Sequence, residues 1–370
     1  MPEIILTNVS KRWGKFVAVD NLNLTIKDRG FVTLLGPSGC GKTTTLRMIA
    51  GLETPTEGKI TIDGVTVFDS EKGIDVSPAK RDIGFLFQNY ALWPHMTVYQ
   101  NIAFGLENLK WPKDKIKARV AELLKLLKIE QFEKRYPSEL SGGQQQRVAI
   151  ARTLAPNPKV LFMDEPLSNL DAKLRLEMRT ELKRLHKETN STFVYVTHDQ
   201  LEAMTLATEV CLMKEGVVQQ YKPPLTVYEE PSNLFVADFV GNPTMNFINA
   251  KAKKIDDHTA EITFHNMTFT YKGEETLGNL NEKVVLGVRP EFIKISNEGI
   301  NAKVYSTLPS GMETTVKFNL NGELLTGVVF GIIDYEVDQE IKIDFVGNDI
   351  ILFDKDTTNR VTNGTLTIKK

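Results

Sequence analysis

The sequence has few cysteines, no long apolar run and no excess of charge of one sign. Two cysteines, Cys40 and Cys211, are too few for a disulfide framework. No apolar stretch approaches the roughly 18 residues of a membrane-spanning helix, and the amino terminus lacks the pattern of a signal peptide. The balance of 45 basic against 47 acidic residues gives no electrostatic reason to expect nucleic acid as a partner. We therefore expect a cytosolic protein of two or three domains that does not bind nucleic acid.

A glycine-rich loop follows a short apolar run near the amino terminus. Residues 36–43 fit the Walker A pattern G-x-x-x-x-G-K-[ST], whose backbone N–H groups cradle phosphates while the lysine neutralises charge and the hydroxyl binds Mg²⁺. The run Phe31–Leu35 before the loop predicts a buried strand, and Lys42–Ala50 after it predicts a helix whose amino terminus faces the phosphates. We interpret Cys40 as filling a variable loop position rather than as a redox site. The predicted nucleotide-binding residues here are Gly36, Pro37, Ser38, Gly39, Cys40, Gly41, Lys42, Thr43 and Thr44.

A second glycine-containing helix start lies in the middle of the chain. Ser141, Gly142 and Gly143 precede the predicted helix Gln144–Arg152, and such a helix amino terminus can bind an anion. The alternative is that Ser141 only caps the helix and the glycines only give flexibility.

Polar side chains follow several predicted strands at their carboxyl ends, where ligands bind in open parallel sheets. Gln88 follows Ile83–Phe87, and His198 follows Phe193–Thr197. The run Lys159–Met163 is followed by Asp164, placed to hold Mg²⁺, and by Glu165, placed to take a proton from water. A capping role for the carboxylates and a structural role for the histidine are the alternatives. The predicted catalytic residues are Glu165, His198, Gln88 and Lys42, and the predicted metal ligands are Thr43, Gln88 and Asp164.

These motifs, in this order, resemble the nucleotide-binding subunit of an ATP-binding cassette (ABC) transporter. The matching elements are the Walker A loop, the Q-loop residue Gln88, the signature Leu140–Gln144, the Walker B run ending at Glu165, the D-loop Ser168–Asp171 and the switch residue His198. The resemblance implies an ATPase with ATP and Mg²⁺ as cofactors. It also implies that two cassettes, in a homodimer or a heterodimer, enclose each nucleotide between the Walker A loop of one and the signature Ser141, Gly142, Gly143 and Gln144 of the other.

The resemblance assigns three further residues to the nucleotide. Trp13 lies where the family carries an aromatic that stacks on adenine, and its alternative is a packing role. Arg135 lies where family members reach the partner's nucleotide, although a basic residue near a helix end is common. Asp171 belongs to the D-loop.

The chain divides by pattern into an α/β P-loop ATPase cassette over residues 1–240, with a helical insert at about 89–155, and a β-rich domain of the OB-like type over 241–370. Apolar residues at helical spacing in Lys115–Leu127 predict a helix of the insert. Alternation in Glu261–Thr270 and in Thr315–Leu320, the latter followed by Asn321-Gly322, predicts strands and a hairpin that close into a small barrel.

A narrower resemblance concerns the second domain. Gly241–Phe247, Gly287–Glu291 and Leu352–Asp356 are similar to the regulatory domain of maltose-type sugar importer ATPases, although Arg289-Pro290 could serve only as a strand-ending turn. This resemblance implies an ATPase at the cytoplasmic face of the membrane, bound to polytopic permease subunits that receive a solute from an external binding protein. The alternatives are a soluble ABC ATPase of DNA repair or translation, or an importer ATPase for polyamine, iron or glycerol phosphate.

The segment Asn89–Val98 resembles the surface that receives a membrane subunit in such importers. We expect Tyr90, Leu92, Trp93 and Met96 to form an exposed patch suited to a partner helix. The alternative is that these residues pack the helical insert against the sheet.

Overall fold

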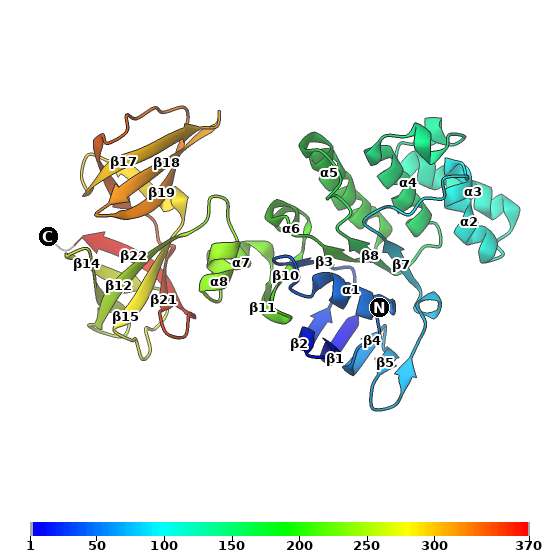
Figure 1. Cartoon of the computed structure of the whole chain (residues 1–370), viewed down its shortest axis with the longest axis horizontal. Helices are drawn as coiled ribbons and strands as arrows, with labels where there is room; N and C mark the ends of the chain where they lie inside the picture. The colour runs from blue at the N-terminus through cyan, green and yellow to red at the C-terminus, as the bar shows by residue number, and fades with distance from the viewer. Residues whose placement is uncertain (1–2, 369–370) are drawn as a thin grey trace. The chain divides into compact units, whose positions relative to one another are not determined.

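The computed structural model describes residues 3–368, and the chain divides into two compact units between Pro224 and Leu225. The first unit contains strands β1 to β11 and helices α1 to α6, most of which are labelled in Figure 1, and the second contains the remaining strands and two short helices. No helix among residues 3–368 combines the length and the apolar composition needed to cross a membrane.

The central sheet of the first unit has the strand order β11-β10-β3-β9-β8-β7. Its strands from β10 to β7 pair in parallel, and β11 adds to the edge in the antiparallel sense. The strand bounds are Phe31–Leu35 (β3), Ile83–Leu86 (β7), Val160–Asp164 (β8), Thr192–Val196 (β9), Glu209–Lys214 (β10) and Val217–Lys222 (β11). The predicted strands at 31–35, 83–87, 159–163 and 193–197 are therefore confirmed within one residue at each end.

The unbroken apolar runs arise because this sheet is buried on both faces. Phe193 and Tyr195 of β9 pack into one core, whereas Val194 and Val196 pack into another. A strand with period two that is buried on both sides has no polar alternation, which is typical of parallel sheets covered on both faces. The polar residues that follow these strands are thereby brought to one edge of the sheet.

One face is covered by the helical insert and by α5 (Ala172–Thr189). The insert contains α2 (Val98–Asn108), α3 (Lys113–Leu126) and α4 (Gly142–Leu154), with 3₁₀ turns at Glu130–Phe132 and Pro137–Glu139. The apolar positions predicted for the 115–127 helix are all buried, which confirms its inward face: Ile116, Val120, Leu123, Leu124 and Leu127. Figure 1 shows α2, α3 and α4 gathered together.

The other face packs against α1 (Lys42–Ala50) and a second sheet of order β2-β1-β4-β5-β6. Its strands are Ile4–Trp13 (β1), Phe16–Ile26 (β2), Glu57–Ile62 (β4), Val65–Asp69 (β5) and Ile74–Asp75 (β6), followed by a 3₁₀ turn at Pro78–Lys80. The helix α6 (Gln200–Leu206) follows β9. A turn at Asp63-Gly64 joins β4 to β5, with positive φ at both residues.

The second unit begins with α7 (Pro224–Glu229) and α8 (Leu234–Phe239) and continues as a closed barrel of order β12-β13-β14-β22-β21-β15. A second sheet has the order β16-β20-β17-β18-β19. The strands of the barrel are Asn246–Lys254 (β12), Thr259–Phe264 (β13), Met267–Gly273 (β14), Lys283–Val288 (β15), Ile350–Asp354 (β21) and Arg360–Ile368 (β22). Those of the second sheet are Ile293–Ser296 (β16), Ile300–Pro309 (β17), Glu313–Leu320 (β18), Glu323–Phe330 (β19) and Glu340–Phe345 (β20), and Pro290–Phe292 is a 3₁₀ turn.

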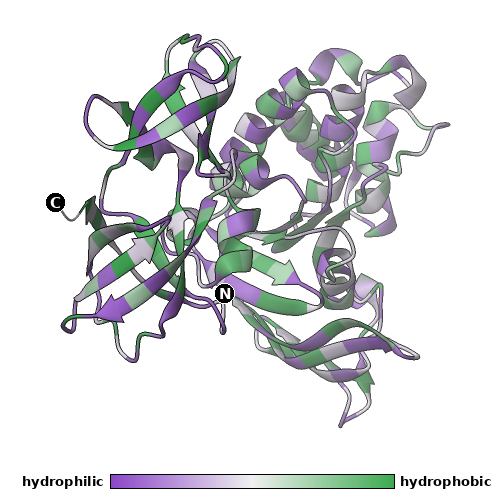
Figure 2. Cartoon of the chain, turned by 60° about the vertical axis from the view of Figure 1, so that its left-hand side comes forward, coloured by the Kyte–Doolittle hydropathy of each residue, from purple (hydrophilic) through white to green (hydrophobic). Residues whose placement is uncertain are grey.

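The barrel and the hairpin at Asn321-Gly322 confirm two predictions for this unit. Buried and less buried residues alternate along β13 and β18, and Figure 2 shows the matching alternation of hydropathy on the strands. The alternating stretch Glu261–Thr270 contains parts of two strands, β13 and β14. His265 and Asn266 take left-handed conformations, with φ of 47° and 61°, and turn the chain into the hairpin β13–β14. Asn favours this conformation, and the alternation on both sides hid the turn.

Candidate functional site

The glycine-rich loop connects β3 to α1, and its conformation excludes side chains at two positions. Gly36 has φ of 149°, and a Cβ there would lie 2.3 Å from the carbonyl oxygen of Met213. Gly41 has φ of 102°, and its Cβ would lie 2.5 Å from the carbonyl oxygen of Ala18. The helix then begins at Lys42 without a side-chain cap, so its first N–H groups are left to bind an anion.

Lys42 is 5% exposed, and its ammonium group bonds to the backbone of the glycine-rich loop. Nζ donates to the carbonyl oxygens of Gly36 at 2.7 Å and Pro37 at 2.9 Å. These bonds keep the buried charge satisfied, and a phosphate oxygen can replace either acceptor. The Sγ atom of Cys40 lies 3.7 Å from the same Nζ, yet burial raises the pKa of the Cys40 thiol. A thiol with a raised pKa is a poor nucleophile.

The end of β8 brings Asp164 next to the first turn of α1. The Thr43 hydroxyl donates to Oδ1 of Asp164 at 2.9 Å, and Arg47 lies 3.4 Å from the other carboxylate oxygen. Asp164 is 5% exposed. A hydroxyl and a carboxylate are hard oxygen donors of the kind that Mg²⁺ prefers, and Mg²⁺ usually takes its remaining ligands from phosphate and water. The pair therefore fits the metal that the loop motif implies.

Glu165 has a left-handed backbone, with φ of 44°. Its N–H donates to the carbonyl oxygen of Val196, and its Oε2 atom lies 3.2 Å from Nδ1 of His198. Two neighbouring strands of the parallel sheet thus bring together a carboxylate and an imidazole that are 33 residues apart in sequence. A carboxylate held in this way can accept a proton from water, with the imidazole beside it.

A buried carboxyl group anchors the loop that carries His198. Glu202 accepts hydrogen bonds from the hydroxyls of Tyr195 and Thr197, both at 2.7 Å. Burial raises the pKa of Glu202, and these two hydrogen bonds oppose that shift. The Thr197 hydroxyl also accepts from the N–H of Asp199, so the backbone on both sides of His198 is fixed. Glu202 was not predicted from the sequence, although a lone acidic residue on the inward face of a helix was a usable signal.

Gln88 lies beside the D-loop. The side-chain amide of Gln88 donates to the hydroxyl of Ser168 at 3.2 Å, and the main-chain carbonyl oxygen of Gln88 accepts from the side chain of Asn169 at 3.1 Å. Thr43 and Asp164 bond to each other instead. Among the hydrogen bonds of residues 3–368, none joins Gln88 to Thr43 or Asp164, and the metal-binding role of Gln88 stays a prediction.

A cavity of about 250 Å³ gathers half of the predicted nucleotide-binding residues, while Gly36 and Pro37 of the same loop are not part of its lining. It is lined by Trp13, Phe16, Ala18, Ser38, Gly39, Cys40, Gly41, Lys42, Thr43, Thr44 and Glu165. Trp13 is 46% exposed, and its ring lies parallel to that of Phe16, at 6.2 Å between centroids. Phe16 was not among the predicted residues. The two aromatics face each other across the Gly14-Lys15 turn of the β1–β2 hairpin, and that spacing was the available signal.

The signature residues form a separate part of the first unit. Ser141 caps α4 by accepting from the N–H of Gln144, whose side chain accepts in turn from the N–H of Ser141. A Cβ on Gly143 would lie 2.7 Å from Leu174 on α5. Asp171 caps α5 by accepting from the N–H of Leu174, and the exposed Arg135 lies over the ring of Phe132. In the described residues 3–368, the cavity beside the glycine-rich loop is lined by none of Arg135, Ser141, Gly142, Gly143, Gln144, Asp171, Gln88 or His198.

The expected docking patch is partly wrong. Tyr90 is 6% exposed and donates its hydroxyl proton to the carbonyl oxygen of Pro166, so it belongs to the core. Burial raises the pKa of Tyr90. Leu92, Trp93 and Met96 are partly exposed, and these three remain the candidates for contact with a partner. Tyr90 has a left-handed backbone, with φ of 59°, and its side chain therefore points in a different direction from that in a regular strand or helix.

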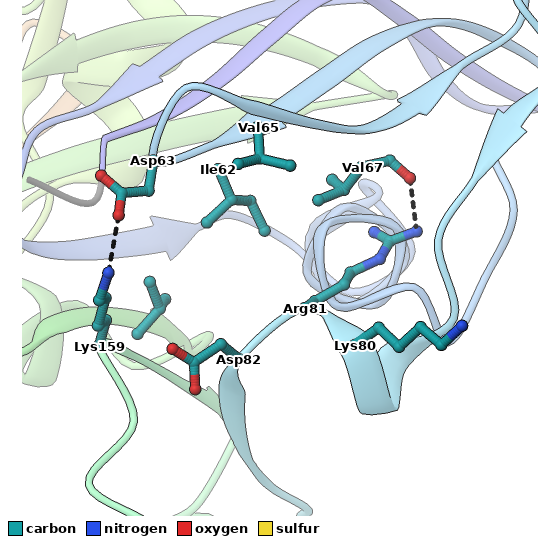
Figure 3. Close-up of a pocket in the computed structure, with 9 residues that line it drawn as sticks. Ile62, Asp63, Val65, Val67, Lys80, Arg81, Asp82 and Lys159 are labelled. Atoms are coloured by element: carbon teal, nitrogen blue, oxygen red, sulfur yellow. Dashed lines mark hydrogen bonds and ion pairs between the residues drawn. The ribbon is translucent and has the colours of Figure 1, made fainter.

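A different pocket, of about 170 Å³, lies between β4, β5 and the start of β8, and Figure 3 shows its lining. Three of its polar side chains, Asp63, Lys159 and Arg81, are paired. Lys159 bonds to Asp63 at 2.8 Å, and Arg81 donates to the carbonyl oxygens of Met48 and Ile49 at the end of α1. Arg81 therefore caps the helix that follows the glycine-rich loop, which is a structural role.

Comparison with known proteins agrees with this geometry. A family model described as "ABC transporter" matches residues 19–168, and one described as "MalK OB fold domain" matches residues 241–293. The trehalose/maltose import ATP-binding protein MalK of Thermococcus litoralis is 43% identical over 369 residues, which cover 96% of this chain and 99% of that protein. The oligosaccharides import ATP-binding protein MsmX of Bacillus subtilis is 42% identical over 373 residues, which cover 98% of this chain and 100% of that protein.

Solved structures resemble the first part of the chain. A dimeric post-hydrolysis structure of the ATP-binding cassette MJ0796, bound to ADP and Pi, is 36% identical with a TM-score of 0.52, and it covers 60% of this chain and 98% of that one. The structure of cbiO1 from Clostridium perfringens, part of the ABC transporter complex cbiONQ, is 33% identical with a TM-score of 0.56, covering 61% and 90%. The predicted fold, a cassette followed by an OB-type domain, is thereby confirmed.

Proposed function

The chain belongs to the ABC transporter ATP-binding subunits, and from this premise we propose that it hydrolyses ATP to drive uptake of a sugar through partner membrane subunits. The observation that carries the proposal is the cavity that unites Trp13, the glycine-rich loop and Glu165. ABC ATPase activity follows from membership, whereas the residue roles and the solute below are proposed.

The loop residues and Lys42 bind the phosphates, and Trp13 together with Phe16 holds the adenine. Thr43 and Asp164 would hold Mg²⁺, which would supply positive charge against the phosphate oxygens. Glu165 accepts the proton of the attacking water, and His198 fixes the carboxylate at 3.2 Å. The side-chain amide of Gln88 lies 3.2 Å from the Ser168 hydroxyl, so the position of Gln88 depends on the conformation of the D-loop.

A second cassette completes the site. Ser141, Gly142, Gly143 and Gln144 form a helix amino terminus suited to an anion, and they lie outside the cavity of their own chain. In a dimer, this terminus of one subunit covers the γ-phosphate held by the loop of the other. Arg135 and Asp171 reach the same nucleotide from that side. Either two copies of this chain or two different cassettes satisfy the requirement.

The solute and the partners are inferred from the relatives. The names of the two full-length relatives concern trehalose, maltose and oligosaccharides, so a sugar is the favoured solute. We infer that permease subunits bind the partly exposed Leu92, Trp93 and Met96, that an external binding protein delivers the sugar, and that the chain lies at the cytoplasmic face of the membrane. A soluble ATPase of DNA repair or translation is not favoured, and polyamine, iron or glycerol phosphate import has no supporting observation here.

Two measurements test this function. The purified chain should bind and hydrolyse ATP with Mg²⁺, whereas Lys42→Ala should lose hydrolysis and Lys72→Ala, at an exposed lysine of the same unit, should keep it. Affinity purification from detergent extracts should retain polytopic membrane proteins. Recovery of ribosomes or DNA in their place would contradict the import role.

We also propose that the ATPase and regulatory functions divide near residues 225–240. Chain contacts divide at Pro224, whereas the OB-type match begins at residue 241. The segment between contains α7 and α8, whose carbonyl groups accept hydrogen bonds from Arg289 of the second unit. A protein ending at 224 should therefore be at least as soluble as one ending at 240, and both should bind ATP. Loss of ATP binding by a folded 1–240 protein would move the boundary.

A further inference from the structure

The residues after Gln88 have an unusual backbone. Tyr90 has φ of 59° and Ala91 has φ of 46°, so two consecutive residues with a Cβ lie in the left-handed region. Such residues are uncommon, and a bulky one there persists only where surrounding contacts hold it. The cause of this conformation should therefore be visible in the contacts of the segment.

Arg152, on α4, holds both residues. Its Nη1 atom donates to the carbonyl oxygen of Ala91 at 2.6 Å, and its Nη2 atom donates to that of Tyr90 at 2.7 Å. The guanidinium also lies over the ring of Trp93, 4.8 Å from its centroid. The planar fork of arginine matches two neighbouring acceptors, which the single ammonium of lysine cannot do.

The contacts with Tyr90, Ala91 and Trp93 stabilise the positive charge of Arg152. No carboxylate forms an ion pair with it within the described part of the chain, residues 3–368. Burial lowers the pKa of Arg152. A partly buried cation without a carboxylate is stabilised by carbonyl oxygens and an aromatic face. Loss of the guanidinium would leave the two carbonyl oxygens without this donor, and loss of the carbonyl oxygens would leave the cation without acceptors.

The same segment is bound at its other side to the residues that follow Glu165. The Tyr90 hydroxyl donates to the carbonyl oxygen of Pro166, and the Gln88 side chain donates to the hydroxyl of Ser168. Asn101 fixes the far end by bonding to the N–H and the carbonyl oxygen of Trp93. The segment 88–93 thus connects the helix that starts at the signature to the loop that carries the catalytic carboxylate.

We propose that Arg152 is a positioning residue that couples α4 to Gln88 by holding the left-handed carbonyls of Tyr90 and Ala91. A shift of α4, as when Ser141 and the following glycines engage a nucleotide, then moves the segment that carries Gln88 and Trp93. Without the fork, Tyr90 and Ala91 relax toward ordinary backbone conformations, and Gln88 loses its place beside Ser168. The inference rests on the proposed function, because the position of Gln88 affects turnover only in an ATPase.

The test compares Arg152→Lys with Arg147→Lys in the full-length chain. Arg147 is the matched control, because it lies on the same helix and donates to a backbone carbonyl oxygen, that of Leu127, outside the segment. Hydrogen exchange of the amides in 88–98 should accelerate about tenfold in Arg152→Lys and stay within about twofold of wild type in Arg147→Lys. ATP turnover at saturation should fall about tenfold only in Arg152→Lys, with ATP affinity unchanged within about twofold.

A second substitution separates positioning from general damage to the fold. Glycine adopts positive φ without strain, so Ala91→Gly added to Arg152→Lys should restore at least half of the lost turnover. Asn157→Gly, at a residue with φ of 59° just after α4, is the control and should restore none. Equal exchange in the two arginine variants, or no rescue by Ala91→Gly, would overturn the proposal. A wild-type chain that failed to hydrolyse ATP would reject the proposed function, and the exchange comparison would still decide whether Arg152 holds the segment.

Discussion

Lys42 in the first unit and Arg289 in the second are both buried cations whose partners are backbone carbonyl oxygens. Lys42 is 5% exposed and bonds to Gly36 and Pro37, while Arg289 is 2% exposed and bonds to Tyr228, Ala237 and Val240. The difference lies in what else can reach the cation. Lys42 lines a cavity, and its acceptors belong to the loop for which we propose phosphate binding, so a ligand can take their place.

The carbonyl groups that bind Arg289 belong to α7, α8 and the residue after α8, and no ligand can replace them. Arg289 follows β15 and immediately precedes the 3₁₀ turn Pro290–Phe292, and its guanidinium lies over the ring of Tyr228, 4.1 Å from the centroid. A Cβ on Gly241 would lie 2.6 Å from its Nη1 atom, which explains why glycine stands there. The turn predicted at Arg289-Pro290 is therefore present, and the buried guanidinium ties α7 and α8 to the barrel. A buried cation on carbonyl groups thus marks a binding site only where its partners can be exchanged.

The largest effect should come from the chemistry of the first unit. Glu165→Gln should slow hydrolysis by roughly 10²–10⁴, about 3–5 kcal/mol of barrier, because the amide cannot accept the proton of water. ATP binding should remain, and the variant should accumulate as an ATP-bound dimer. Single-turnover kinetics at saturating ATP measures the effect. Glu177→Gln, at an exposed position of α5, is the control, and equal rates in both variants would remove Glu165 from the mechanism.

In the second unit, loss of the Arg289 guanidinium should lower the stability of the fold and leave nucleotide binding intact. Arg289→Met leaves buried carbonyl groups without donors and should lower the free energy of unfolding of this unit by about 3 kcal/mol. ATP affinity should stay within about twofold of wild type. Denaturant unfolding checks the first expectation, with the exposed Lys294→Met as control, for which about 0.5 kcal/mol or less is expected. If Arg289→Met weakened ATP affinity, Arg289 would contribute to nucleotide binding, as is proposed for Lys42, and its role would not be only structural.

A smaller effect concerns the aromatic wall of the cavity. Trp13→Ala should weaken ATP binding by about 1–3 kcal/mol, the usual worth of a base stacked on an aromatic ring, with little change in turnover at saturation. Phe330→Ala removes an aromatic that is 82% exposed in the second unit and should change nothing. Nucleotide titration followed by calorimetry gives both affinities. If the two variants bound ATP equally well, Trp13 would have only a packing role.

The smallest effect concerns the pH dependence of stability in the first unit. Burial lowers the pKa of His186, whose Nε2–H donates to the carbonyl oxygen of Arg29. The folded state therefore keeps His186 neutral to lower pH than the unfolded state does. Its contribution is complete above the unfolded pKa of about 6.5 and is lost as pH falls through the folded pKa. Unfolding measured from pH 8 to pH 5 should show a shallower decline in His186→Gln, while the exposed His258→Gln should follow wild type.

Much of this protein followed from local sequence pattern. The unbroken apolar runs predicted the strands of the central sheet, and the glycine-rich loop before a helix predicted the phosphate site. These features are local, because strand period, helix period and loop chemistry are set by residues adjacent in sequence. The order of the motifs along the chain then identified the family, and residues 36–44 needed no tertiary information to be placed.

The tertiary structure alone decided which side chains meet. Tyr90 turned into the core, Phe16 joined Trp13 in the cavity, and Gln88 bonded to Ser168, 80 residues away. Arg152 reached the carbonyl oxygen of Ala91 over 61 residues of sequence. Spacing along the chain carries no information about such contacts, because they depend on how the helical insert packs against the sheet and on left-handed backbone that only those contacts stabilise.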